Sequence, residues 1–141
     1  MNPRRRPTRL LLVLAAVFGV LGVACSDTKS PAVEGVLPTR AVDAGSVEVS
    51  ITPTRFDAQG STFAIVLDTH AVELSMDLAA SAVLDVDGRR WPGAGWNGDG
   101  PGGHHREGEL RFDPGGGARG TARLTIAGFP KPIEVTWDLP G

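Results

Sequence analysis

Hydrophobic and polar residues alternate with a period of two in several short stretches of this chain. That period places one set of side chains against a core and the other in solvent, so it predicts half-buried β-strands. A short apolar segment at residues 82–86, ended by the turn pair Asp87-Gly88, adds another expected strand. The alternating stretches span residues 46–52, 61–69, 72–78, 109–113, 121–127 and 132–139.

Strands of this length, separated by turn signals every eight to twelve residues, predict an all-β domain. We expect an antiparallel, immunoglobulin-like β-sandwich of seven to eight short strands. The alternation changes phase between Leu67 and Val72, which predicts a bulge, bend or crossover near residues 68–71. Residues 71–84 are the one stretch whose sequence is also compatible with a helix. Residues 88–120 hold twelve glycines and three prolines, so most of that region is expected to be irregular.

The first 25 residues have the anatomy of an export signal. Four arginines precede fifteen uncharged, mostly apolar residues, too few to span the roughly 30 Å hydrocarbon core as a helix. The run Leu21-Gly22-Val23-Ala24-Cys25 resembles the lipobox of bacterial lipoproteins, which implies cleavage before Cys25 and lipid on its thiol. An ordinary secretory signal is the alternative. Lipid on Cys25 predicts an exported protein held on the outer face of the cell membrane, or on the outer membrane of a two-membrane bacterium.

Three segments follow from this interpretation. We expect a signal peptide over residues 1–24, a lipidated cysteine and flexible tether over residues 25–43, and the β-sandwich domain over residues 44–141. Loss of four of the 14 basic residues leaves ten against 16 acidic, a net charge of −6. That charge argues against a nucleic-acid partner. A lipidated Cys25 leaves no thiol for a disulfide, a zinc-thiolate site or a cysteine nucleophile.

The three histidines suggest a metal site. His104 and His105 precede one expected strand and His70 follows another, with Asp68 two residues before it. Adjacent residues of a strand point to opposite faces, so one of the pair with His70 and a carboxylate such as Asp68 would make the better set. Three such ligands with an open position suit zinc or copper(II). The alternative, which we favour, is that one histidine hydrogen-bonds to backbone and another is solvated, with no cofactor bound.

Two tryptophans lie in the glycine-rich region between residues 91 and 106. Trp91 and Trp96, with Asn97 and Arg106 nearby, would form a platform for a sugar or a protein. The alternative is that the indoles pin the loop to the end of the sandwich. No serine has the context of a hydrolytic nucleophile, so an enzyme is not expected.

Several segments together resemble a family of uncharacterised secreted or lipid-anchored bacterial domains. They include Thr69-His70-Ala71-Val72-Glu73-Leu74 and Gly102-Gly103-His104-His105-Arg106, and the resemblance covers roughly residues 47–139. It implies that His70, His104 and His105 belong to one module and adds no activity. The sequence therefore predicts a non-enzymatic, lipid-anchored envelope domain that binds a protein or small ligand through residues 91–106. A zinc- or copper(II)-binding or delivery protein is the alternative.

Overall fold

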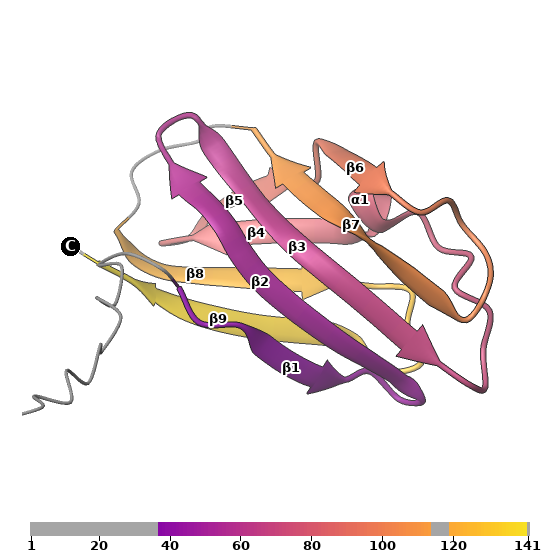
Figure 1. The fold of residues 1–141 in the computed structure, drawn as a ribbon. Coiled ribbons are helices and arrows are strands. Elements are labelled where there is room, and N and C mark those ends of the chain that lie inside the picture. The colour runs from indigo at the N-terminus through magenta and orange to yellow at the C-terminus, as the bar shows by residue number, and fades with distance from the viewer. Residues whose placement is uncertain (1–36, 114–118, 141) are drawn as a thin grey trace, which may run out of the picture. The chain divides into compact units, whose positions relative to one another are not determined.

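The computed structural model describes residues 37–113 and 119–140, which form an antiparallel β-sandwich with one short helix (Figure 1). The predicted fold class is confirmed. The sandwich lies within the compact unit Ala32–Gly141. The predicted signal peptide and Cys25 lie outside the described residues. In chain order the elements are β1 (Arg40–Asp43), β2 (Val47–Asp57), β3 (Gly60–Thr69), α1 (Leu78–Ser81), β4 (Ala82–Val86), β5 (Arg89–Pro92), β6 (Gly95–Gly98), β7 (His105–Phe112), β8 (Gly120–Ile126) and β9 (Ile133–Leu139).

The strands of the described residues form two sheets. One has five strands in the order β1-β2-β3-β7-β6, and the other has four in the order β5-β4-β8-β9. All neighbouring strands are antiparallel. The chain changes sheet after β3, β5 and β7, so segments far apart in sequence lie side by side. Figure 1 shows the five-stranded sheet in front, with its outer face toward the viewer.

The core lies between the two sheets and is built by the alternation seen in the sequence. Inward residues of β2 and β3 are at most 2% exposed, and those of β8 and β9 pack against them. Phe63 of β3 packs against Trp137 of β9, with 5.4 Å between ring centroids, which joins the sheets directly. The inward residues of these four strands are Val47, Val49, Ile51, Phe63, Ile65, Leu67, Ala122, Leu124, Ile126, Ile133, Val135, Trp137 and Leu139.

The domain begins earlier than the sequence predicted. Strand β1 lies inside the segment expected to be a flexible tether, so the boundary between residues 43 and 44 is wrong. Trp137 Nε1 donates to the Pro38 carbonyl at 2.7 Å, and Arg40 Nε donates to the Thr136 carbonyl at 3.2 Å. These contacts hold the entering chain beside β9. A four-residue edge strand with mostly exposed side chains carries little apolar pattern, so the sequence did not reveal it.

Residues 72–78 are a crossover between the sheets and not the predicted strand. The apolar alternation changes phase near residues 68–71 because the chain leaves β3 there and crosses to the other sheet. A crossover was one of the predicted causes of this phase change. Leu74 and Leu78 are buried in the core, which accounts for the apolar alternation. The Asp77 carboxylate caps α1 by accepting from the Ala80 amide at 3.0 Å, so the helical alternative holds for one turn.

Much of residues 88–120 is regular structure, against the prediction of irregular chain, since β5, β6 and β7 lie within it. Glycine serves close packing there. Gly98 pairs with Gly108, and a Cβ on Gly108 would lie 2.6 Å from the Gly98 Cα and 2.7 Å from Trp96 Cζ2. The two strands and the covering indole therefore leave no room for a side chain at residue 108.

Candidate functional site

Residues 91–106 are not one loop. Trp91 lies on β5 of the four-stranded sheet, whereas Trp96 and Asn97 lie on β6 of the five-stranded sheet and Arg106 lies on β7. Both indoles are half-buried against the core, and Asn97 is exposed opposite Glu109. The predicted continuous binding loop is therefore wrong. The two tryptophans pin neighbouring edge strands to the sandwich, as the alternative interpretation expected.

Arg106 is buried, with 2% of its surface exposed, so it is not a surface contact for a ligand. Its Nη1 donates to the carbonyls of Leu74 at 3.0 Å and Met76 at 2.9 Å, and its Nη2 donates to the Asp99 carbonyl at 3.2 Å. The guanidinium lies 5.6 Å from the centroid of the Trp96 ring. Burial lowers the pKa of Arg106, and the charges of Asp99 and Asp77 oppose that shift.

The Gly102-Gly103 pair holds the loop before β7 against the crossover. Both residues have positive φ, 114° and 72°, a conformation that favours glycine. The Gly102 amide donates to the Leu74 carbonyl at 2.8 Å, and the Leu74 amide donates to the Gly103 carbonyl at 2.9 Å. The Thr69 amide donates to the His104 carbonyl at 2.9 Å. The backbone of residues 102–104 therefore holds the loop before β7 in place.

The structure brings together two of the four predicted metal ligands. His105 Nδ1 lies 2.6 Å from Asp68 Oδ1, and His105 Nε2 lies 3.8 Å from Glu107 Oε2. The hydrogen bond with Asp68 raises the pKa of His105, desolvation opposes this shift, and the charges of Asp68, Glu107 and Asp99 add to it. His70 and His104 are exposed near the same ends of β3 and β7. Among residues 37–113 and 119–140, no group of three or more His, Cys, Asp or Glu side chains is arranged to hold a metal ion.

The Asp68–His105 pair is part of a row of charged side chains across four strands. Asp43 of β1 pairs with Glu48 of β2, Glu48 with Asp68 of β3, and Asp68 with His105 of β7. Directly opposite residues of antiparallel strands have Cα atoms about 4.5–5.5 Å apart, and all four side chains lie on the outer face. We call these four residues the acidic row.

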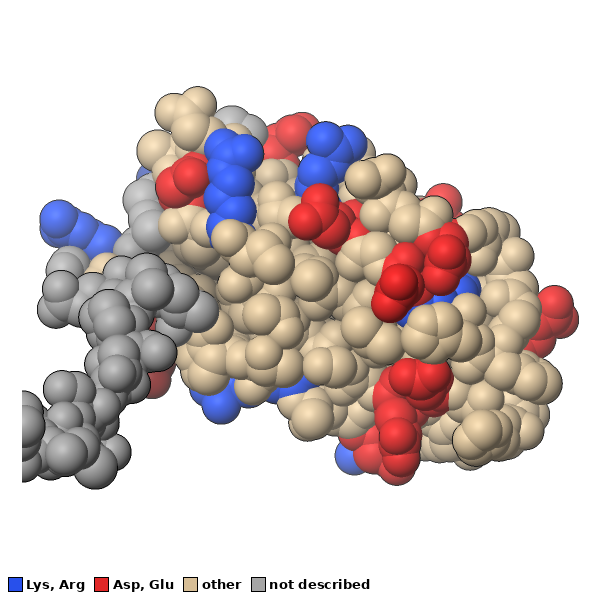
Figure 2. Space-filling model, in the orientation of Figure 1, with Lys and Arg blue, Asp and Glu red and all other residues tan. Residues whose placement is uncertain are grey.

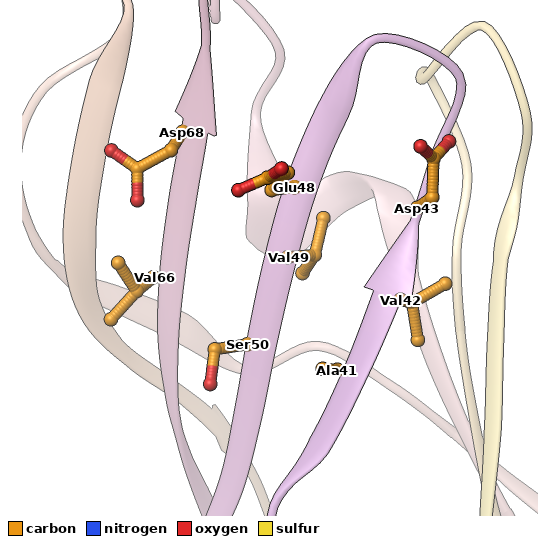
Figure 3. A pocket seen from close by; sticks show the side chains of 8 residues that line it. All are labelled: Ala41, Val42, Asp43, Glu48, Val49, Ser50, Val66 and Asp68. Atoms are coloured by element: carbon orange, nitrogen blue, oxygen red, sulfur yellow. The ribbon is translucent and has the colours of Figure 1, made fainter.

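A hollow of about 370 Å³ lies beside the acidic row on the outer face of the five-stranded sheet. Figure 3 shows the carboxylates of Asp43, Glu48 and Asp68 at one level across three strands, with small side chains at the next level. Small residues next to longer ones leave the sheet surface recessed there. The hollow is lined by Ala41, Val42, Asp43, Glu48, Val49, Ser50, Val66 and Asp68.

The electrostatics of this hollow favour positive charge. In the described part of the chain, neither Asp43 nor Glu48 has a basic side chain within 4.0 Å, and Asp68 has only His105. Among the charged atoms at this end of the visible face, Figure 2 shows more red than blue. Like charges placed opposite one another on a sheet repel, so a cation that lies between them relieves the repulsion. The sequence showed that Glu48 points outward but not that β1 and β3 align carboxylates beside it.

No family model, curated protein or solved structure matches this chain. In the part of the chain that the structure describes, none of the helices has the length and apolar character needed to cross a bilayer.

Proposed function

We propose that this chain is an exported, lipid-anchored domain of the bacterial cell envelope that binds a cationic ligand at the acidic row without catalysing a reaction. The observation that carries the proposal is the alignment of Asp43, Glu48 and Asp68 at one side of the 370 Å³ hollow. The lipobox at Cys25 supports the anchor. Because Trp91 and Trp96 are half-buried and Arg106 is buried, we assign the proposed binding surface to this face and not to residues 91–106.

The ligand class follows from the charge and the shape of the hollow. Three carboxylates side by side attract a molecule with one or more ammonium or guanidinium groups, such as a polyamine or a lysine- or arginine-containing peptide. Ser50 offers a hydroxyl, while Ala41 and Val66 offer apolar contact to the aliphatic part of such a molecule. An open hollow on a solvated sheet suits reversible binding of modest affinity.

The proposal is tested with the compact unit Ala32–Gly141, which contains every residue of the described core. Tetralysine is titrated by calorimetry into this domain and into an Asp43→Asn, Glu48→Gln, Asp68→Asn triple variant. Each exposed charge contributes about 0.5 kcal/mol, so the triple variant is expected to bind roughly tenfold more weakly. Asp138→Asn, an exposed carboxylate of β9, is the matched control. Equal affinity of the wild-type domain and the triple variant for tetralysine contradicts the proposal.

Metal binding is the second candidate function, and the short Asp68–His105 contact favours it. A zinc or copper(II) ion held there would replace the proton between these two side chains. It would also bind His70, which follows β3, or His104, which precedes β7. Titration of each metal into the domain and into a His70→Ala, His104→Ala, His105→Ala variant separates the two candidates. Stoichiometric binding lost in the histidine variant supports metal handling, and equal weak binding by both proteins contradicts it.

A further inference from the structure

The outer face of the five-stranded sheet has a second hollow at the opposite end of β3 from the acidic row. This hollow has a volume of about 170 Å³ and lies over Thr62. Thr62 pairs with Arg55 of β2 on one side and with Arg111 of β7 on the other, so two guanidinium groups flank it. Asp113 and Ala94 also line the hollow.

Of the two arginines that line this second hollow, Arg111 forms no ion pair with a described residue. Arg55 is occupied by Asp57, with its Nε 2.9 Å from Asp57 Oδ2, and this contact raises the pKa of Arg55. Arg111 has no acidic side chain within 4.0 Å among the described residues. Gly95 lies opposite Arg111, and a Cβ at Gly95 would lie 3.2 Å from Arg111 Nη2, so the glycine leaves room for the guanidinium. Arg111 is therefore free to form a paired hydrogen bond with an oxyanion.

A strip of small side chains connects the two hollows. Between them β3 presents Thr62, Ala64 and Val66 outward, and all three are half-buried. The neighbouring strand β7 presents the longer, exposed Glu107 and Glu109 along one side of this strip. Figure 2 shows a largely tan area on this face with red and blue atoms around it. A molecule lying along β3 meets carboxylates at one end and arginines at the other.

We propose that the ligand of this face is a short extended peptide with a basic residue at the acidic row and a free carboxylate at Arg111. This inference rests on the proposed function and adds the anionic end of the ligand. Asp68 lies six positions after Thr62 along β3, and at about 3.3 Å per residue the two are roughly 20 Å apart. An extended peptide of about six or seven residues has the same length.

The charges in the second hollow favour a carboxylate that belongs to a peptide with a basic residue over a small free anion. Asp57 neutralises Arg55, and the acidic residue Asp113 is among those that line the hollow, so a small free anion is held weakly. A carboxylate on a peptide already held by the acidic row has an effective local concentration in the millimolar range. The two ends then bind together more tightly than either end alone.

The test uses a heptapeptide with two N-terminal lysines, five neutral residues and a free C-terminal carboxylate, beside the same peptide with a C-terminal amide. Each is titrated into the Ala32–Gly141 domain and its Arg111→Ala, Arg111→Lys and Arg89→Ala variants. The wild-type domain is expected to bind the carboxylate about three- to tenfold more tightly than the amide. Arg111→Ala removes this preference, Arg111→Lys restores part of it, and Arg89→Ala on β5 leaves it intact.

The relative affinity of the two peptides also shows when the inference fails. If Arg111 does not receive the carboxylate, the amide binds at least as tightly, because it lacks a negative charge that an acidic domain repels. Equal or tighter binding of the amide overturns the inference, and so does a carboxylate preference that persists in Arg111→Ala. If both peptides bind equally and the acidic-row triple variant loses both, the proposed function stands alone. If neither peptide binds the wild-type domain, both proposals fall.

Discussion

Asp68 Oδ1 lies 2.6 Å from His105 Nδ1, and this contact joins the row of carboxylates to the only basic ring in it. Both side chains are about half exposed. The acidic row therefore includes one basic group, and the contact with Asp68 raises its pKa above the ordinary value of an imidazole.

The pKa of His105 should lie above its ordinary value of 6.5, because Asp68 stabilises the imidazolium. The stabilisation of the fold by this pair is fully present below pH 6.5 and is lost as the pH rises through the raised pKa. A pH titration of the His105 ring followed by NMR measures the shift directly. Asp68→Asn should bring the pKa back toward 6.5, and Glu107→Gln should change it less. A pKa that is the same in wild type and Asp68→Asn contradicts the contact.

Binding of tetralysine should tighten as the pH rises through the pKa of His105. The imidazolium neutralises part of the charge of Asp68, and its loss of a proton leaves an additional net negative charge in the row. Asp68, Glu107 and Asp99 act on His105 electrostatically, and Glu48 lies one strand further along the row. Calorimetry across this pH range should show the trend in the wild-type domain and a much weaker trend in His105→Gln. A trend of the same size in both proteins would assign it to another group.

Arg106→Ala should destabilise the fold by about 3 kcal/mol, since it removes the side-chain donor of the Met76 carbonyl and one of the donors of the Leu74 and Asp99 carbonyls. Urea unfolding measures the loss. Arg111→Ala, an exposed arginine on the same strand, should change the free energy of unfolding by less than about 0.5 kcal/mol. Similar stability of the two variants would show that the guanidinium of Arg106 does not hold the crossover in place.

Gly108→Ala should cost about 1–3 kcal/mol of stability, because its new Cβ would lie 2.6 Å from the Gly98 Cα. Gly100→Ala is the matched control, since no atom lies within 4 Å of a Cβ built there. Thermal unfolding of the two variants should differ clearly. An Ala at residue 108 that is as stable as one at residue 100 would mean that β6 and Trp96 lie further from β7 than described.

The alternation of apolar residues predicted the long strands because burial of one face leaves a direct record in sequence. Val47, Val49 and Ile51 face the core as expected, and so do Phe63, Ile65 and Leu67. Short edge strands leave a weaker record. The sequence predicted a flexible tether where β1 lies. It did not predict β5 and β6, because the glycines in this region allow close packing of backbones and do not mark irregular chain.

The candidate site could be predicted only in part. The metal-site hypothesis named Asp68 together with one histidine of the His104–His105 pair, and Asp68 lies beside His105, but the acidic row depends on which strands are neighbours and in which register. These are properties of contacts between distant segments. Arg106 was expected at the surface, as arginines usually are, yet three backbone carbonyls and the Trp96 ring make its burial possible.

Binding at the acidic row is tested by titrating tetralysine into the ¹⁵N-labelled Ala32–Gly141 domain and following the amide signals by NMR. We expect saturable shifts of the amides of Glu48, Asp68 and His105, with the outer residues of β8 and β9 unaffected. The same titration of the acidic-row triple variant should move these signals far less. Shifts that gather on the four-stranded sheet, or an unchanged spectrum at saturating peptide, would contradict binding at the acidic row.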